Sequence, residues 1–384
     1  MRHSTDRILT THVGSLPRPH NLLDMLKARL EGKATDDAAF NDLLRRSVED
    51  MVAKQVACGI DIVTDGEMSK PGHAVYVNNR LSGFEPRPDV DLGLYQAERD
   101  AFPEYYKDYF ERAHLGGAIS IAAPMFCVGD IRYTGQEELQ TDLQNLKDAT
   151  AKHGCEEVFV PSAAITGVGT NEHYPTEEAY LFALADAMAV EYNAVVDAGF
   201  LLQVDDPFLP NVYMDESLDD AGKDRKAAMY VEAINHSIKG IPSEKIRFHT
   251  CYGINQGPRV HEPDLPDMID RVLDVNAGAY SFEAGNPRHE HEYHLWENTK
   301  LPDGKLVLPG VITHATSVIE HPDLIAERIV RFAERVGREN VIASTDCGFS
   351  SQATYKTEVE PRIVWAKLEA LTEGAKRASA ILWR

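Results

Sequence analysis

Short runs of β-branched and aliphatic residues alternate with longer amphipathic stretches along the whole chain, and each short run ends in polar or glycine-containing residues. The runs have the length and composition of buried strands. Their apolar positions are continuous rather than alternating, which is typical of a parallel sheet covered on both faces. We find nine such runs, at residues 8–15, 60–67, 119–126, 157–164, 201–207, 246–253, 279–285, 306–313 and 341–348.

The stretches between these runs carry apolar residues at helical spacing. The clearest are residues 43–59, 176–199 and 321–337, each of which closes on a glycine, a common helix stop. Because strand and helix alternate along the chain, we predict an α/β fold in which helices cover a parallel sheet.

Polar side chains favour a closed barrel over an open doubly wound sheet. A barrel gathers all the carboxyl-terminal strand ends around one axis, whereas an open sheet leaves many of them far from any single crevice. Ten polar residues at such ends are spread over the full chain: Asp65, Glu67, Asp205, Asp206, His249, Cys251, Glu283, His314, Asp346 and Cys347. We therefore predict a single (β/α)8 TIM barrel over residues 1–384 with long inserted βα loops, although nine candidate strands exceed the eight that a barrel needs.

Two segments interrupt the alternation. Residues 68–118 form a long connection with an aromatic, charged stretch, which we interpret as an inserted helical excursion. Such excursions usually act as lids or subunit contacts, and a solvated hairpin without a chemical role is the alternative. The second, residues 286–305, carries His289, Glu290, His291, Glu292 and His294 without a spacing that closes a tetrahedral metal site, and we predict a solvated loop there.

The charge balance excludes several classes of partner. The chain has 39 Lys and Arg against 61 Asp and Glu, a net charge of −22, which repels phosphate backbones and anionic lipid head groups. No apolar run approaches the roughly 18 residues of a membrane span, and residues 1–14 have no secretory apolar core. We expect a cytoplasmic protein with no nucleic-acid or membrane partner. The sequence leaves the oligomeric state open, a homo-oligomer included.

Five cysteines lie far apart, an odd number that does not suggest a disulfide framework. Cys58, Cys127 and Cys155 fall within apolar or helical patterns, so we expect them to pack as small apolar residues. Cys251 and Cys347 instead follow candidate strands, where chemistry is concentrated in a barrel. Only these two thiols are therefore candidates for a functional role.

A zinc site is predicted at the strand ends. His249 and Cys251 are two residues apart in a predicted strand, so both side chains point to the same face. Glu283 and Cys347 end later runs, and one imidazole, two thiolates and one carboxylate suit Zn²⁺ better than Mg²⁺ or Ca²⁺. Since the four residues are spread over the expected catalytic face, we favour a catalytic site in which an incoming thiol binds and loses its proton.

Other strand-end residues suit the recognition of an amino-acid thiol. Carboxylates such as Glu67 and Asp205 can hold an ammonium group or relay protons, and helix capping is the alternative for each. His314 is a candidate general acid for a leaving group, and a packed or capping histidine is its alternative.

Six motifs occur in a fixed order: TTHVGSLPRP, TDGE, QVDDP, HTCYG, SFEAG and STDCG. In this order they resemble the cobalamin-independent methionine synthase family, over essentially the whole chain but only the carboxyl-terminal catalytic barrel of the long two-barrel enzymes. The resemblance implies zinc held by His249, Cys251, Glu283 and Cys347. It also implies a homocysteine site made of the Val13–Gly14–Ser15 backbone for the carboxylate and Glu67 and Asp205 for the amine, with His314 as the proton donor.

In this family, zinc holds homocysteine as a thiolate that attacks the methyl group of a methyltetrahydrofolate. Asn211 stands where the family has a pterin-contacting glutamate, and residues 160–175 contain no tryptophan for pterin stacking. The methyl donor is therefore left open. Opening of an epoxide by coenzyme M is an alternative within the same zinc-thiolate chemistry, for which Arg18 and Lys70 are candidate sulfonate partners. A zinc hydrolase on a barrel is the alternative from another class.

Overall fold

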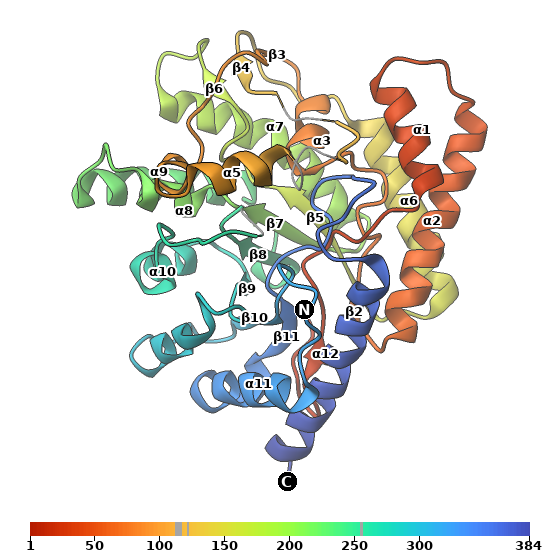
Figure 1. The fold of residues 1–384 in the computed structure, drawn as a ribbon, viewed down its shortest axis with the longest axis vertical. Helices are drawn as coiled ribbons and strands as arrows, with labels where there is room; N and C mark the ends of the chain where they lie inside the picture. Colours follow the sequence, from red (N-terminus) through yellow and green to blue (C-terminus); the bar gives the residue numbers. More distant parts are fainter. Residues whose placement is uncertain (112–116, 121–122, 254–255) are drawn as a thin grey trace.

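The computed structural model describes residues 1–111, 117–120, 123–253 and 256–384. At its centre lies an eight-stranded parallel sheet ringed by helices (Figure 1). In the spatial order of the sheet, the strands are β1 (Leu9–Thr10), β11 (Ile342–Thr345), β10 (Leu306–Ile312), β9 (Ala279–Phe282), β8 (Ile246–Thr250), β7 (Leu201–Asp206), β5 (Glu157–Ala163) and β2 (Ile62–Val63).

Hydrogen bonds between the two outermost strands bring the sheet close to a cylinder. Asp61 N, just before β2, donates to Thr10 O in β1 at 3.1 Å, and Thr10 N donates to the Asp61 carboxylate at 2.8 Å. Thr11 Oγ1 donates to Ile62 O at 3.0 Å. The prediction of a TIM barrel is confirmed, with a nearly closed barrel in place of an open sheet.

One of the nine predicted strands, at residues 119–126, does not belong to the barrel, and that prediction was wrong. The described residues of the run predicted at 119–126 form no part of the barrel. β4 (Met125–Cys127), at the end of the run, pairs instead with β3 (Phe84–Pro86) and β6 (Thr170–Asn171) in a separate three-stranded sheet. Residues 121–122 of this run lie outside the described residues. Apolar content alone could not separate this edge of a small sheet from a barrel strand.

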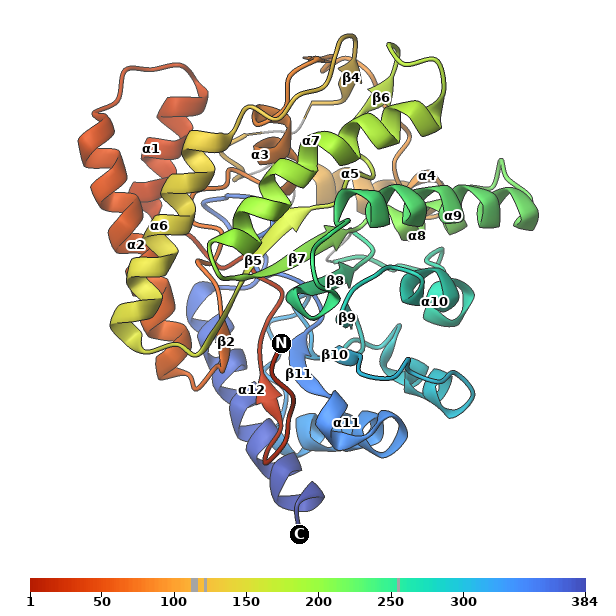
Figure 2. The ribbon, with the colours of Figure 1, turned by 180° about the vertical axis from the view of Figure 1, so that it is seen from behind.

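Helices cover the outside of the barrel (Figures 1 and 2). The long ones are α1 (His20–Leu30), α2 (Asp37–Ala57), α6 (Gln136–His153), α7 (Glu177–Asp197), α9 (Asp220–Ser237), α10 (Leu265–Leu273), α11 (Pro322–Val336) and α12 (Pro361–Leu382). The short ones are α3 (His73–Asn79), α4 (Gln96–Ala101), α5 (Pro103–Tyr109), α8 (Leu209–Met214) and the 3-10 turns η2 (Ser243–Lys245), η3 (Glu290–Glu297) and η4 (Arg338–Asn340).

Helix ends agree with the signals in the sequence. The Thr176 side chain accepts a hydrogen bond from Ala179 N at 3.1 Å and caps α7. Gly337 follows α11 with a φ of 90°, a backbone angle that favours glycine. The predicted helices 43–59, 176–199 and 321–337 correspond to α2, α7 and α11.

The core consists of two apolar layers. Side chains from seven of the eight strands fill the barrel: Leu9, Ile62, Phe159, Leu201, Ala279, Leu306, Leu308 and Ile342. A larger cluster lies between the strands and the helices. α7 is long and apolar enough to cross a membrane by length and composition, but it packs on β5 and β7 and buries nine residues. We therefore interpret α7 as a core helix of the barrel.

Candidate active site

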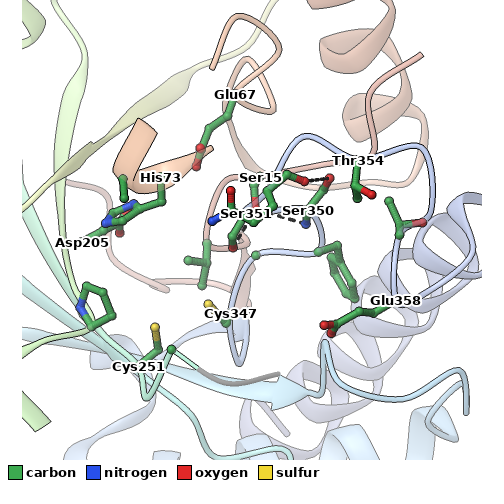
Figure 3. Close-up of a pocket in the computed structure, with 18 of the residues that line it drawn as sticks. Ser15, Glu67, His73, Asp205, Cys251, Cys347, Ser350, Ser351, Thr354 and Glu358 are labelled. Atoms are coloured by element: carbon green, nitrogen blue, oxygen red, sulfur yellow. Dashed lines mark hydrogen bonds between the residues drawn. The ribbon is translucent and has the colours of Figure 1, made fainter. Parts of the chain in front are cut away.

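A cavity of about 320 Å³ opens among the strand ends and their loops (Figure 3). Its inner wall contains His249, Cys251 and Cys347 together with the two carboxylates Glu67 and Asp205. Residues from the 68–118 excursion, among them Leu94, Tyr95 and Tyr109, also line it. The cavity thus brings together segments from the beginning, middle and end of the chain.

One group of candidate metal ligands lies in this wall. In the described part of the chain, ligand atoms of His249, Cys251 and Cys347 lie within 4.8 Å of one another. His249 is at the end of β8, Cys251 directly follows it, and Cys347 follows β11, three strands away in the sheet. Figure 3 shows the two sulfur atoms turned toward each other. This group can hold a metal ion.

The surroundings of His249 and Cys347 fit a cation. His249 Nδ1 is 3.1 Å from Ser281 Oγ, while its buried Nε2 has no hydrogen-bond partner among the described residues. A ring nitrogen fixed on one side and unbound on the other is the usual arrangement of a histidine that ligates a metal. Burial lowers the pKa of His249 to about 3, so the ring is neutral. A hydrogen bond from the Cys347 thiol to Cys251, and burial, raise the pKa of the Cys347 thiol, a tendency that a bound divalent cation would reverse.

Glu283, the fourth predicted ligand, directly follows β9 but does not belong to this group. Its Oε2 accepts hydrogen bonds from Arg259 Nη2 and Asn286 Nδ2, each at 2.8 Å. Asn286 also donates to Asp346 at 3.0 Å, next to Cys347. The structure therefore places Glu283 in a polar network beside the sulfurs, and its role as a ligand stays a prediction.

That network extends into the second excursion, where the prediction of a solvated loop was wrong for two residues. His289 and Glu292 are buried, and His289 lies between Glu292 and Glu262, with N–O distances of 3.0 and 3.1 Å. Its ring stacks on Tyr252, and the two carboxylates raise the pKa of His289 to about 9. Arg259 bonds both Glu262 and Glu283. Glu262 and Arg259 come from the loop after β8, and Glu262 is 27 residues from His289, so local spacing could not reveal this contact.

Glu67 and Asp205 form a pair of buried acids in the cavity wall. Gln203 Nε2 donates to Asp205 Oδ1 at 2.8 Å. Burial first, then the charge of Glu67, raises the pKa of Asp205 well above its usual range, and burial likewise raises the pKa of Glu67. Two carboxyl groups whose charged forms are disfavoured by burial form a site for a cation.

Two other predicted acids shape the backbone. Asp65 Oδ1 accepts a hydrogen bond from Glu67 N at 2.8 Å, and Glu67 adopts a left-handed φ of 60°. Asp206 Oδ1 accepts hydrogen bonds from Phe208 N and Leu209 N and so holds the turn that leads into α8. Both acids thus bond backbone amides of the turns after their strands, whereas a helix N-cap was the predicted alternative for such residues.

The Val13–Gly14–Ser15 segment lies at the cavity, with Val13 and Ser15 in its lining. Val13 N donates to Thr345 Oγ1 and Gly14 N to His12 Nδ1, at 3.3 and 3.2 Å. Ser15 N makes no hydrogen bond within the described residues. Of the three predicted carboxylate-binding amides, the one at Ser15 is thus free to bind a ligand.

Three further predicted residues are buried away from the cavity lining. His314 follows β10 and is 2% exposed, and burial, with Arg259 next, lowers its pKa to about 3. Arg18 bonds Glu67 O and Ser350, and Lys70 Nζ bonds Pro161 O at 2.5 Å. In the described residues none of the three lines the cavity.

Sequence reasoning missed other residues of the cavity. His73, the first residue of α3, lines it, and so do Ser350 and Ser351 after β11. The interpretation of 68–118 as a lid was the signal that could have pointed to His73. A lone histidine in the sequence SKPGHAVY carries no spacing pattern of its own.

Comparison with known proteins decides the family. The model of the family described as "Cobalamin-independent synthase, Catalytic domain" matches residues 8–113 and 116–364. The chain belongs to this family. It is similar to the methionine synthase of Thermococcus kodakarensis, 23% identical over 370 residues, with 96% of this chain and 92% of the relative covered. It is also similar to the 2-hydroxypropyl-CoM lyase of Xanthobacter autotrophicus, 24% identical over 409 residues, with 98% and 96% covered.

Solved structures of family members share the fold. A B12-independent methionine synthase from Shewanella sp. W3-18-1, in complex with selenomethionine, superimposes with a TM-score of 0.72 at 19% identity, covering 98% of this chain and 99% of that one. A putative vitamin-B12-independent methionine synthase from Listeria monocytogenes gives a TM-score of 0.66 at 19% identity, covering 97% and 98%. The family resemblance drawn from the six motifs is confirmed.

Proposed function

We propose that the protein is a zinc-dependent thiol S-methyltransferase that transfers a methyl group to homocysteine and so forms methionine. The observation that carries the proposal is one cavity wall holding both a His–Cys–Cys ligand group and a pair of buried carboxylates. A thiol ligand site and an ammonium site in the lining of one cavity suit a small amino acid with a terminal thiol. The family membership and the methionine synthases among its relatives support the same reaction class.

The proposed ion is Zn²⁺, held by His249, Cys251 and Cys347, with Glu283 as the fourth ligand. Two thiolates and one imidazole are a donor set that Zn²⁺ prefers. When bound, zinc lowers the pKa of a coordinated thiol and so supplies a thiolate at neutral pH. A reducing compartment such as the cytoplasm keeps both cysteines available, and all five cysteines are free thiols in the structure.

The charges of the cavity favour homocysteine over a sulfonate thiol such as coenzyme M. Glu67 and Asp205 would hold the α-ammonium group, and Ser15 N would donate to the α-carboxylate. Arg18 and Lys70, the cations that a sulfonate would need, bind protein carbonyls outside the cavity lining. Because the chain is also similar to a 2-hydroxypropyl-CoM lyase, coenzyme M is tested below as the competing acceptor.

The methyl donor is a 5-methyltetrahydrofolate-type compound or another methyl donor. We propose His314 as the acid that protonates the leaving group, from its position after β10 beside the centre. The 68–118 excursion would act as a lid, because Leu94, Tyr95 and Tyr109 form part of the cavity wall.

A matrix of acceptors and donors tests the proposal. Zinc-loaded protein is incubated with homocysteine or coenzyme M, and with mono- or polyglutamylated methyltetrahydrofolate, methylcobalamin or a small epoxide. Formation of methionine from homocysteine with any methyl donor supports the proposal. Turnover of an epoxide with coenzyme M alone favours the alternative, and ester or amide hydrolysis without any thiol transfer would indicate a zinc hydrolase.

A further inference from the structure

One row of buried side chains inside the barrel contacts the segment that carries the predicted carboxylate-binding amides. Pro161 of β5, Gln203 of β7 and Arg247 of β8 are neighbours in the register of the sheet. All three are buried, and Gln203 and Arg247 are completely so. They meet residues 11–14, the stretch that leads from β1 to Ser15. The row therefore ties this stretch to three neighbouring strands.

Each of these strands contacts a different residue of the stretch. A Cβ on Gly14 would lie 2.6 Å from Cγ of the β5 proline, so these two residues are packed closely together. Gln203 Nε2 donates a hydrogen bond to Val13 O. Arg247 Nη2 donates another to His12 O at 3.0 Å. The barrel thus sets the path of this backbone residue by residue.

Gln203 also contacts an acid of the cavity wall. The same Nε2 donates its second hydrogen to Asp205 Oδ1 at 2.8 Å. A carbonyl and a carboxylate can only accept, so the nitrogen of the amide must face them and both of its N–H groups are used. Gln203 Oε1 is buried and has no hydrogen-bond partner among the described residues. An unbound buried oxygen opposes folding, which points to a role of this amide in the site.

The two contacts of Gln203 join the two halves of the proposed acceptor site. Val13 lies two residues before Ser15, whose amide would bind the α-carboxylate, and Asp205 belongs to the pair that would bind the α-ammonium group. In an α-amino acid both charged groups are attached to one carbon atom, so the groups that bind them must be held at one separation. A buried amide bonded to both sides holds that separation.

Gln203 also affects the charge of Asp205. Burial, followed by the charge of Glu67, raises the pKa of Asp205. The charge of Lys70, the hydrogen bond from Gln203 and the charge of Arg247 oppose that rise. Loss of the amide would therefore weaken the attraction of Asp205 for any ammonium group, and a test of alignment must hold the charges of the ligand constant.

We propose that Gln203 is a positioning residue that aligns the carboxylate-binding and ammonium-binding sides of the acceptor site. This alignment makes the site selective for an α-amino acid over a thiol whose amine and carboxylate are on different carbon atoms. The inference rests on the proposed function. Within the described residues Gln203 does not line the cavity, so it acts through Val13–Gly14–Ser15 and Asp205 rather than on the substrate.

Binding of two zwitterionic thiols to the zinc-loaded protein, measured by calorimetry, tests this role. One is homocysteine, and the other is 3-amino-5-mercaptopentanoate, which has one more carbon between the amine and the carboxylate. Both carry the same charges, so a change in the charge of Asp205 affects both alike. We expect the native protein to bind homocysteine about tenfold more tightly or better, and Gln203→Met, which removes both donors, to bind the two within about threefold of each other.

A second variant and a control complete the test. Gln203→Glu serves if Gln203→Met loses zinc or does not fold, and the ratio should narrow there too, because a carboxyl group has at most one hydrogen and cannot bond both acceptors. Tyr280→Phe is the matched control. It removes a buried hydroxyl that bonds Val275 O at 2.9 Å, outside the cavity lining, and should leave the ratio unchanged.

Two results would overturn the role of Gln203. One is native protein that binds both zwitterions equally well, and the other is a ratio of dissociation constants that stays the same in both Gln203 variants. Failure of the native protein to bind homocysteine at all would overturn the proposed function instead. A purely structural role of Gln203 would weaken the binding of both zwitterions by the same factor, so the ratio separates positioning from general destabilisation.

Discussion

At the scale of single residues, the candidate site contains a few buried polar groups that have no hydrogen-bond partner, or no ion-pair partner, among the described residues. His249 Nε2 and Ser15 N lack partners in the described residues. Glu67 and Asp205 form no ion pair there, although the charge of Lys70, outside the cavity lining, acts on both. Each is an unsatisfied group that a ligand can satisfy. Together they outline a metal, a carboxylate and an ammonium group.

Asp205→Asn should weaken the binding of homocysteine more than the binding of a thiol without an amine. An asparagine cannot become the charged partner of the ammonium group, which predicts a rise in the KM for homocysteine of about 30-fold or more. The KM for a thiol of similar length without an amine should stay unchanged, and zinc content is the control. An equal rise in KM for both thiols would show that Asp205 does not bind the ammonium group.

Gly14→Ala should destabilise the cavity wall. Gly14 has a φ of 141°, and a Cβ there would lie 2.6 Å from Pro161 Cγ and 3.0 Å from Glu67 Oε1. We expect a loss of about 1–3 kcal/mol in the free energy of unfolding, measured in urea, together with loss of homocysteine binding. Gly32→Ala is the control, because Gly32 also has a positive φ, of 67°, but nothing lies within 4 Å of its added Cβ. If both variants lost the same free energy of unfolding, the cause would be the positive φ and not the contacts of the added Cβ.

At the scale of elements, strand ends and excursions share the construction of the site. β8, β11 and the residues after them supply the candidate metal ligands, β7 and the turn after β2 supply the acids, and residues of the 68–118 excursion line one side. Buried ion networks fasten these loops to the barrel. Arg80, on the excursion, contacts Asp142 of α6 and Glu191 of α7 at 2.7 and 3.4 Å.

Arg259→Met should be strongly destabilising. Arg259 is 4% exposed and pairs with Glu262 and Glu283, so its loss leaves two buried carboxylates without their main partner. We expect a decrease of about 3–5 kcal/mol in the free energy of unfolding. Arg271→Met removes ion pairs that are largely exposed, and should cost no more than about 1 kcal/mol. Similar decreases for both variants would contradict a structural role for the network.

Glu98→Ala tests the proposed lid. Buried Glu98 accepts hydrogen bonds from Tyr106 Oη at 2.7 Å and from His261 N at 2.8 Å, linking α4 and α5 to the loop after β8. Hydrogen exchange of α4 and α5 should rise by about tenfold or more, because two buried donors lose their acceptor. Exposed Glu104→Ala should leave exchange unchanged. If α4 and α5 exchange at the same rate in Glu98→Ala as in the native protein, Glu98 does not hold the excursion in place and the prediction is wrong.

At the scale of the whole molecule, periodicity was enough to predict the barrel, because eight of the nine runs are its strands. The strand-end rule also identified His249, Cys251 and Cys347, since adjacent and nearby strands end at one face. What stayed hidden depends on contacts between distant segments. His73 reaches the cavity through the path of the excursion, and Glu262 and Arg259 bury His289 and bind Glu283 from another loop.

The large negative charge of the molecule affects which ligands can approach the cavity. A net charge of −22 disfavours polyanions in general, and the inner cavity adds two buried acids. A polyglutamylated donor would approach this surface with like charge, whereas the proposed amino-acid acceptor would present its ammonium group to Glu67 and Asp205. The donor screen with mono- and polyglutamylated folates therefore measures a property of the whole molecule.

Zinc K-edge absorption spectroscopy with and without homocysteine measures the central claim most directly. We predict a resting shell that contains two sulfur ligands from Cys251 and Cys347, and one additional sulfur at about 2.3 Å when homocysteine is present. Cys251→Ser should lose zinc or activity, and Cys58→Ser, far from the group, should lose neither. A zinc shell that homocysteine leaves unchanged would contradict thiol activation at this site.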